Sequence, residues 1–157
     1  MKKLNIFLLI ILILLLGFVA YFFIGGTLAA QANIVTAPAS DHREAFDSIR
    51  GVVASNAAPQ QYAGSLPQSP EGYTLIDVSI TLTNNGLFPA EWLHITAAPL
   101  PGDVAVYSLT GEGSDIAARS ASQVNLKVVT TEASDADRTV TITYYTYGIP
   151  RRIDVSF

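Results

Sequence analysis

The sequence predicts a mainly β protein: an N-terminal transmembrane helix, a short amphipathic helix, and an antiparallel β-sandwich of six or seven strands. Three observations lead to this fold class. The chain opens with an apolar run, apolar and polar residues alternate with a period of two from Tyr73 onward, and turn-forming residues cluster between the alternating runs. Short strands at this spacing favour a sandwich, because a parallel sheet would need crossover helices between its strands.

The apolar run extends from Ile6 to Ile24, contains no charged residue, and follows Lys2 and Lys3. Its nineteen residues form a helix of roughly 28 Å, close to the roughly 30 Å of bilayer hydrocarbon. Residues 1–25 are therefore predicted to be a cytoplasmic tip and a single membrane-spanning helix. Since the next basic residue is Arg43, the positive-inside bias places the N-terminus in the cytoplasm and the rest of the chain outside.

A cleaved secretory signal is the alternative interpretation of the same run. Ala30-Gln31-Ala32 is a small-x-small triplet of the kind that signal peptidases recognise, and cleavage after it would release a protein that begins at Asn33. The apolar run is longer than a usual signal core of about 7–15 residues, which favours the uncleaved anchor. Both interpretations export the domain. The chain has no cysteine, which excludes a lipobox anchor, disulfides and thiolate metal sites.

Acidic residues dominate the part of the chain after the apolar run. Seven basic residues stand there against thirteen acidic ones, a formal charge of −6. Such a surface repels nucleic acid and anionic lipid headgroups, so nucleic acid is not a predicted partner. The length suits one modest globular domain.

Residues 26–72 are predicted to connect the anchor to the domain. Gly25–Ser40 is rich in small residues without periodicity and indicates a juxtamembrane stalk. Asp41–Ser55 has apolar residues at helical spacing, with Asp41 and Glu44 as a capping box, and predicts a short amphipathic helix. Ala57–Gly72 contains three prolines and indicates a linker or surface loop.

Residues 73–157 hold the predicted sandwich. Each predicted strand has one apolar and one polar face, which is typical of a strand that is buried on one side. A short seventh strand is predicted around Ile116–Arg119. The residues predicted to face inward are Ile76, Val78, Ile80 and Leu82; Leu93 and Ile95; Val104 and Val106; Val124, Leu126 and Val128; Val140, Ile142 and Tyr144; and Ile153, Val155 and Phe157.

Two stretches within residues 73–157 resemble a known module. Val78–Gly86, with the turn sequence Thr83-Asn84-Asn85-Gly86, and Asp115–Val124 are similar to elements of bacterial and archaeal immunoglobulin-like modules of the cell-adhesion-related type. Arg119 stands where glycine is common in those modules, and the chain has no tandem copies. The resemblance implies an immunoglobulin-like sandwich that acts as a non-catalytic spacer or interaction domain, and it implies no particular ligand.

Catalytic and cofactor-binding patterns are not found in the sequence. His42 and His94 are the two histidines, and no Gly-x-Ser-x-Gly elbow surrounds a serine. We therefore expect neither an enzyme nor a cofactor. Glu132, Asp135 and Asp137 could supply oxygen ligands to calcium, but they lack the spacing of an EF-hand loop, and a solvated hairpin loop is the favoured interpretation.

Aromatic side chains are the better candidates for recognition. Because Val140, Ile142 and Tyr144 are predicted to face inward, Tyr145 and Tyr147 should face outward. Exposed rings are enriched at interfaces and stack on sugars, although packing of these rings within the chain is the favoured interpretation. Arg151 and Arg152 are predicted to form a local positive spot beside Tyr147, and they could pair with Asp154 or with acids of a partner. The predicted partner or ligand-binding residues are Trp92, His94, Tyr145, Tyr147, Arg151 and Arg152.

Two functions from different classes remain open on these grounds. The favoured hypothesis is a membrane-anchored accessory or structural protein whose domain binds another protein of the cell envelope. The alternative is a module, anchored or secreted, that binds cell-wall or extracellular polysaccharide through Trp92, Tyr145 and Tyr147.

Overall fold

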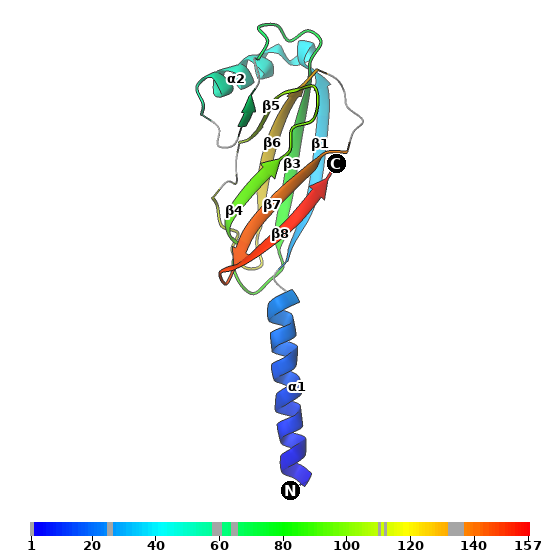
Figure 1. Cartoon of the computed structure of the whole chain (residues 1–157), viewed down its shortest axis with the longest axis vertical. Helices are drawn as coiled ribbons and strands as arrows, with labels where there is room; N and C mark the ends of the chain where they lie inside the picture. Colours follow the sequence, from blue (N-terminus) through cyan, green and yellow to red (C-terminus); the bar gives the residue numbers. More distant parts are fainter. Residues whose placement is uncertain are drawn as a thin grey trace.

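The computed structural model describes residues 2–24, 27–57, 61–63, 66–109, 111, 113–131 and 137–157. Helix α1 (Lys2–Ile24) leads into a β-sandwich, and the two lie end to end along the long axis of the molecule (Figure 1). Every side chain from Lys3 to Tyr21 is exposed. Helix α1 therefore has the length, composition and exposure of a membrane anchor or of a signal sequence.

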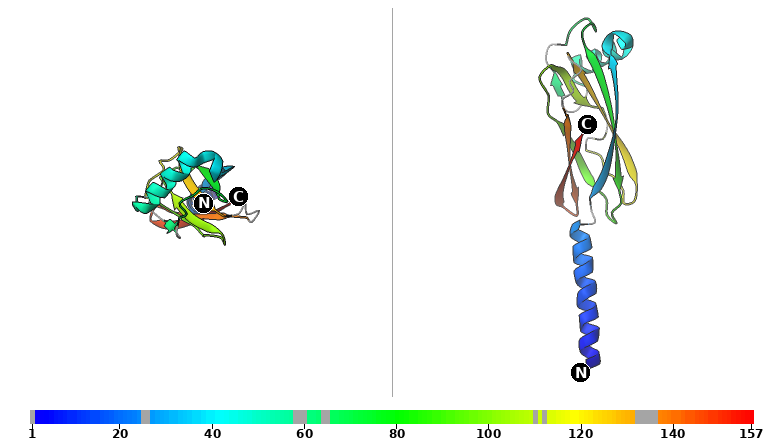
Figure 2. Two further views of the ribbon diagram at one scale, coloured as in Figure 1. Left: turned by 90° about the horizontal axis from the view of Figure 1, so that it is seen from above. Right: turned by 90° about the vertical axis from the view of Figure 1, so that its right-hand side faces the viewer.

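Two antiparallel sheets form the sandwich (Figure 2). The five-stranded sheet has the order β1 (Leu28–Pro38), β3 (Thr74–Asn84), β6 (Ala121–Thr130), β5 (Asp103–Ser108) and β2 (Gln61–Ala63). The three-stranded sheet has the order β4 (Glu91–Ala97), β7 (Thr139–Thr146) and β8 (Ile149–Ser156). The mainly β class, the sandwich and the six strands expected after Tyr73 are confirmed. The expected seventh strand is reduced to a single bridge between Ala90 and Ile116.

The main core lies between the two sheets and follows the predicted alternation. Ile80, Leu82 and Ile142 are fully buried in it, since each points inward from a strand with one wet face. Strand β5 departs from the pattern at Val104. A bulge shifts its register, and Val104 packs with the second cluster instead of the main core.

Strand β1 is the largest correction to the organisation expected from sequence. The prediction of a stalk over Gly25–Ser40 is wrong for the described residues, because β1 pairs with β3 along its whole length, from Leu28 opposite Asn84 to Pro38 opposite Thr74. Most of its side chains are exposed, so this edge strand needs no alternation of apolar and polar residues. The sandwich therefore starts with β1; Gly25 and Gly26 lie outside the described residues.

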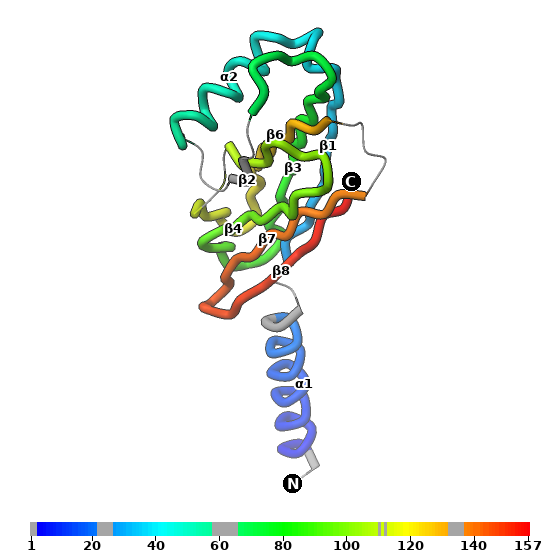
Figure 3. Tube along the Cα trace, turned by 45° about the horizontal axis from the view of Figure 1, so that its top comes forward, coloured from blue at the N-terminus to red at the C-terminus, as the bar shows by residue number. Residues whose placement is uncertain are grey.

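The short helix is confirmed with a different start. A 3₁₀ turn, η1 (Ala39–His42), precedes α2 (Arg43–Ala54), and no side-chain hydrogen bond caps the N-terminus of either element, so the predicted capping box is not formed. Helix α2 lies at the end of the sandwich opposite α1 (Figure 3). Its Phe46 and Ile49 pack in a second buried cluster.

The second cluster explains why β5 buries both of its faces. Val106 belongs to the main core, whereas Ala105 and Tyr107 pack with α2. The segment expected to be a Pro-rich linker belongs partly to the five-stranded sheet, because its residues Gln61–Ala63 form strand β2 beside β5. Part of the predicted linker is thus a strand of the five-stranded sheet.

Candidate functional site

Trp92 lies on a bulge of strand β4. The register between β4 and β7 shifts between Glu91 and His94, and Trp92 has a positive φ of 57°. Its backbone N–H donates a 2.9 Å hydrogen bond to Oδ1 of Asp115. Trp92 is 73% exposed on the face of β4 opposite the buried Leu93, the outward position that recognition would require.

Trp92 and Tyr145 lie at one shallow hollow. Tyr145 is 44% exposed and stands opposite Glu91 in the ladder between β7 and β4. A hollow of about 400 Å³ is lined by Glu91, Trp92, Tyr145 and Gly148. Two of the predicted rings therefore meet at one place, next to a carboxylate that can accept hydrogen bonds.

Tyr147 belongs to a different surface. It forms with Gly148 the two-residue turn between β7 and β8, and the φ values of 57° and 70° are those of a type I′ turn. Its ring meets the ring of Phe88 edge-on, with centroids 4.3 Å apart. Phe88 and its neighbour Leu87, from the loop between β3 and β4, were not among the predicted residues.

The two arginines lie on opposite faces of β8, so they do not form one positive spot. Arg152 is exposed and donates from Nε to Oδ1 of Asp154 at 2.9 Å, the pairing that the sequence offered as one option. Hydrogen bonds from Thr141 and then Arg152 lower the pKa of the Asp154 carboxyl. Arg151 stands opposite the buried Tyr144. His94 is exposed on β4.

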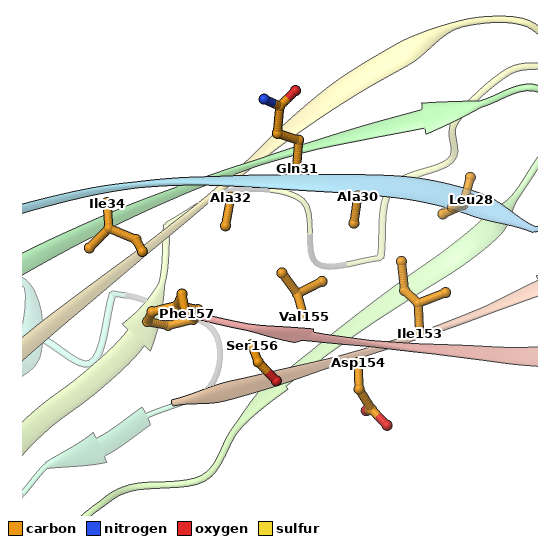
Figure 4. Close-up of a pocket in the computed structure, with 10 residues that line it drawn as sticks. All are labelled: Leu28, Ala30, Gln31, Ala32, Ile34, Ile153, Asp154, Val155, Ser156 and Phe157. Carbon is orange, nitrogen blue, oxygen red and sulfur yellow. The ribbon is translucent and has the colours of Figure 1, made fainter. Parts of the chain in front are cut away.

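A groove between the edge strands β1 and β8 was not anticipated from the sequence (Figure 4). Its volume is about 610 Å³. Side chains from both strands point into it, while Gln31, Asp154 and Ser156 point away. The inward side chains are apolar, and two of those from β1 are alanines, which leave the space between the strands open. They are Leu28, Ala30, Ala32 and Ile34 from β1 and Ile153, Val155 and Phe157 from β8.

Both strands that border the groove have a free edge among the described residues. Strand β1 ends the order of one sheet and β8 ends the order of the other. Arg138 and Phe157 exchange two backbone hydrogen bonds of 2.8 and 2.9 Å. Because bonded and non-bonded pairs alternate along an antiparallel ladder, Asp154 and Ser156 direct their backbone N–H and C=O groups to the free edge.

The possible calcium loop lies mostly outside the described residues. Glu132 and Asp135 belong to that part of the chain, and Asp137 is exposed. In the described ranges, no three His, Asp or Glu side chains come together as metal ligands would.

Comparisons with known proteins bear on the fold alone. No family model matches the chain, and no curated protein matches it. The chain is similar in structure to the GAE domain of GGA1 from yeast, with 13% identity, 59% of this chain and 94% of that chain covered, and a TM-score of 0.43.

Two further solved structures are similar at the same level. A FixG-related protein from Vibrio parahaemolyticus has 8% identity, with 82% of this chain and 94% of that chain covered and a TM-score of 0.39. An uncharacterized β-sandwich protein from Clostridium difficile 630 has 11% identity, with 81% and 84% covered and a TM-score of 0.31. These likenesses assign no family, and the resemblance to cell-adhesion-related modules stays a prediction.

Proposed function

We propose that this chain is a membrane-anchored, non-catalytic protein whose sandwich binds an extended segment of another envelope protein in the groove between β1 and β8. The groove is the observation that carries the proposal. It joins an apolar floor to two strand edges that have no strand neighbour in the described part of the chain. The apolar, exposed helix α1 supports the anchor, and Lys2 and Lys3 support a cytoplasmic N-terminus with the sandwich outside.

An extended peptide is the occupant that the groove favours. A free edge offers backbone donors and acceptors at every second residue, and an added strand satisfies them while its alternate side chains enter the groove. Ile34 is 41% exposed at the groove, and Ala30 is exposed beside it. Apolar side chains at alternate positions of a partner strand would cover this surface, so we propose a partner segment that alternates apolar and polar residues.

Photocross-linking at neighbouring positions of β1 tests the groove. A diazirine amino acid replaces Ile34, which lines the groove, or Val35, which is 58% exposed and lines a different surface. We expect one discrete adduct of the full-length protein in cells from position 34, and much less from position 35, because only the first reaches a strand in the groove. Mass spectrometry of the adduct identifies the joined segment.

A matched pair of second substitutions completes this test. Ala30→Leu fills the groove and should remove the adduct, whereas Gln31→Leu, on the face that points away, should leave it unchanged. Equal adducts from positions 34 and 35 would contradict the proposal. An adduct made of two copies of this chain would also contradict it, since the groove would then join identical molecules.

Polysaccharide binding is a second candidate, favoured by the hollow at Trp92. The exposed indole, the Tyr145 ring and the Glu91 carboxylate combine a stacking surface with a hydrogen-bond acceptor, which suits a sugar ring. Retention of the full-length protein on insoluble cell-wall polysaccharide, lost in Trp92→Ala and kept in Ala30→Leu, would favour this function over the groove.

A further inference from the structure

Exposed apolar and aromatic side chains gather at one end of the sandwich. The loop between β3 and β4 contributes Leu87, which is 46% exposed, and the turn between β7 and β8 contributes Tyr147, which is 61% exposed. The rings of Tyr147 and Phe88 meet edge-on at 4.3 Å, so turns from the two sheets form one surface. We call Leu87, Phe88 and Tyr147 the aromatic tip.

The aromatic tip lies at the end of the sandwich that faces α1 (Figure 1). Leu28, the first residue of β1, pairs with Asn84, the last residue of β3, and the loop with Leu87 and Phe88 follows directly. Leu28 comes four residues after Ile24, the end of α1, and four residues span at most about 14 Å. The start of β1, and with it this end of the sandwich, must therefore stay close to the end of α1.

The loop of the aromatic tip is held in place by one buried side chain. Nδ2 of Asn84 donates to the carbonyl oxygen of Phe88 at 2.8 Å, and Oδ1 accepts from the backbone N–H of Gly86 at 2.9 Å. On the other side, the type I′ turn fixes Tyr147. The exposed Tyr147 ring and the half-buried Phe88 ring beside it therefore stand on braced backbone segments.

The charge of the aromatic tip differs from that of the domain around it. Residues 85–89 and 147–150 contain no charged side chain, although the part of the chain after α1 carries a formal charge of −6. An acidic surface is repelled by anionic headgroups, whereas uncharged segments with Leu, Phe and Tyr partition into the membrane interface. Within the domain, these uncharged turns are suited to contact lipid.

We propose that the aromatic tip enters the headgroup region of the outer leaflet beside α1 and seats the sandwich on the membrane. This inference rests on the proposed function in one respect, that α1 spans the bilayer. Tyr is favoured at the interface because its ring is apolar and its hydroxyl stays wet, and Leu87 adds apolar area that is otherwise exposed to water. The seated tip limits how far the sandwich can tilt, so the groove stands at a fixed height above the bilayer.

A single tryptophan reporter tests the contact with lipid. The sequence contains one Trp, so Trp92→Phe gives a silent background for Leu87→Trp at the aromatic tip or Ser48→Trp on α2, at the opposite end. The full chain is reconstituted into phosphatidylcholine vesicles whose lipids carry bromine high on the acyl chain. We expect bromine to quench the reporter at position 87 several-fold more strongly than the reporter at position 48, which remains open to aqueous iodide.

Tyr147→Trp provides a second reporter in case Leu87→Trp misfolds, and it should be quenched in the same way. Equal, weak quenching at the tip and at position 48 in folded protein would overturn the inference. Alkaline carbonate extraction of the same vesicles separates the two proposals. If carbonate extracts the chain, the proposed membrane anchor is wrong. If the chain stays in the membrane while the reporter at the aromatic tip is not quenched, only the proposed contact of the tip with lipid is wrong.

Discussion

Replacing Arg138 with methionine is expected to lower the free energy of unfolding by about 3–5 kcal/mol, because the Asp103 carboxylate would stay buried without its partner. The two side chains form a double hydrogen bond, Nη1 to Oδ2 and Nη2 to Oδ1, each 2.8 Å. Their exposed fractions are 7% for Arg138 and 0% for Asp103. Since Asp103 begins β5 and Arg138 directly precedes β7, the pair also ties the two sheets together.

The same pair gives the protein a predictable response to acid. Burial opposes ionisation of Asp103, but hydrogen bonds from Arg138 and from the backbone N–H of Leu100, with the charge of Arg138, outweigh it and lower the pKa of the carboxyl. A folded pKa below the unfolded one stabilises the protein above about pH 4, and this stabilisation is lost as the pH falls through the folded pKa. Arg138→Met removes two of the causes that lower this pKa, so the variant should lose less stability than the parent protein when the pH is lowered.

Chemical denaturation of the full chain in detergent, at neutral and acidic pH, measures both effects. Arg152→Met is the matched control, because its pair with Asp154 is exposed and screened by water and should contribute little to stability. The double variant Asp103→Leu with Arg138→Met should be more stable than Arg138→Met alone, since no charge is left unpaired. A loss below about 1 kcal/mol in the single variant would show that the pair is not essential.

Replacing Asn84 with aspartate is expected to cost about 2–4 kcal/mol, because an amide that donates hydrogen bonds becomes a carboxylate that cannot. Asn84 is 2% exposed. Its Nδ2 group faces the carbonyl oxygens of Phe88, Ile116 and Ala117 at 2.8, 3.1 and 3.2 Å. In the variant, a negative oxygen would face these three acceptors, and the loop of the aromatic tip would lose its brace.

Asn85→Asp is the control for this prediction, since the neighbouring side chain is exposed and has the same chemistry. Denaturation in detergent compares the two variants, and hydrogen exchange of the loop amides reports local loosening. We expect faster exchange at the amides of residues 86–88 and of Ala90 in Asn84→Asp alone. Equal stability of the two variants would mean that the hydrogen bonds of Asn84 contribute little to the fold.

Much of the sandwich follows from local pattern. The alternation of Ile76, Val78, Ile80 and Leu82 predicts both the strand and its buried face, because successive side chains of a strand point to opposite sides. The same rule places Tyr145 outside. Sequence also identifies Asn84 as part of a turn, but two of the three carbonyl groups that its amide faces, those of Ile116 and Ala117, belong to a distant loop that no local pattern names.

Strand β1 shows where this reasoning fails. Its burial pattern has no period of two, since most of its side chains are exposed at the edge of a sheet. Small residues such as Ala30 and Ala32 are tolerated there because the strand is held by its backbone pairing with β3. Backbone hydrogen bonds do not depend on side-chain type, so such a strand leaves little trace in the sequence.

Some features of the candidate site also follow from local sequence pattern, and others do not. The alternation that buries Leu93 and Tyr144 also predicts that Trp92 and Tyr145 are exposed, whereas the separation of Tyr147 from them depends on contact with Phe88. The groove was missed entirely. Its existence follows from β1 and β8 being the last strands of their sheets, which is a property of the strand order and not of either strand.

Local sequence patterns predict the apolar helix, the six strands after Tyr73, the short amphipathic helix and the acidic charge of the chain after α1. Three features follow instead from how the chain folds in space: which strands are edges, the pairing of Asp103 with Arg138, and the meeting of two distant turns. The two groups of features differ in the distance along the chain over which they are set. Periodicity and turn chemistry act over a few neighbouring residues, whereas edges, ion pairs and shared surfaces depend on which distant segments lie side by side.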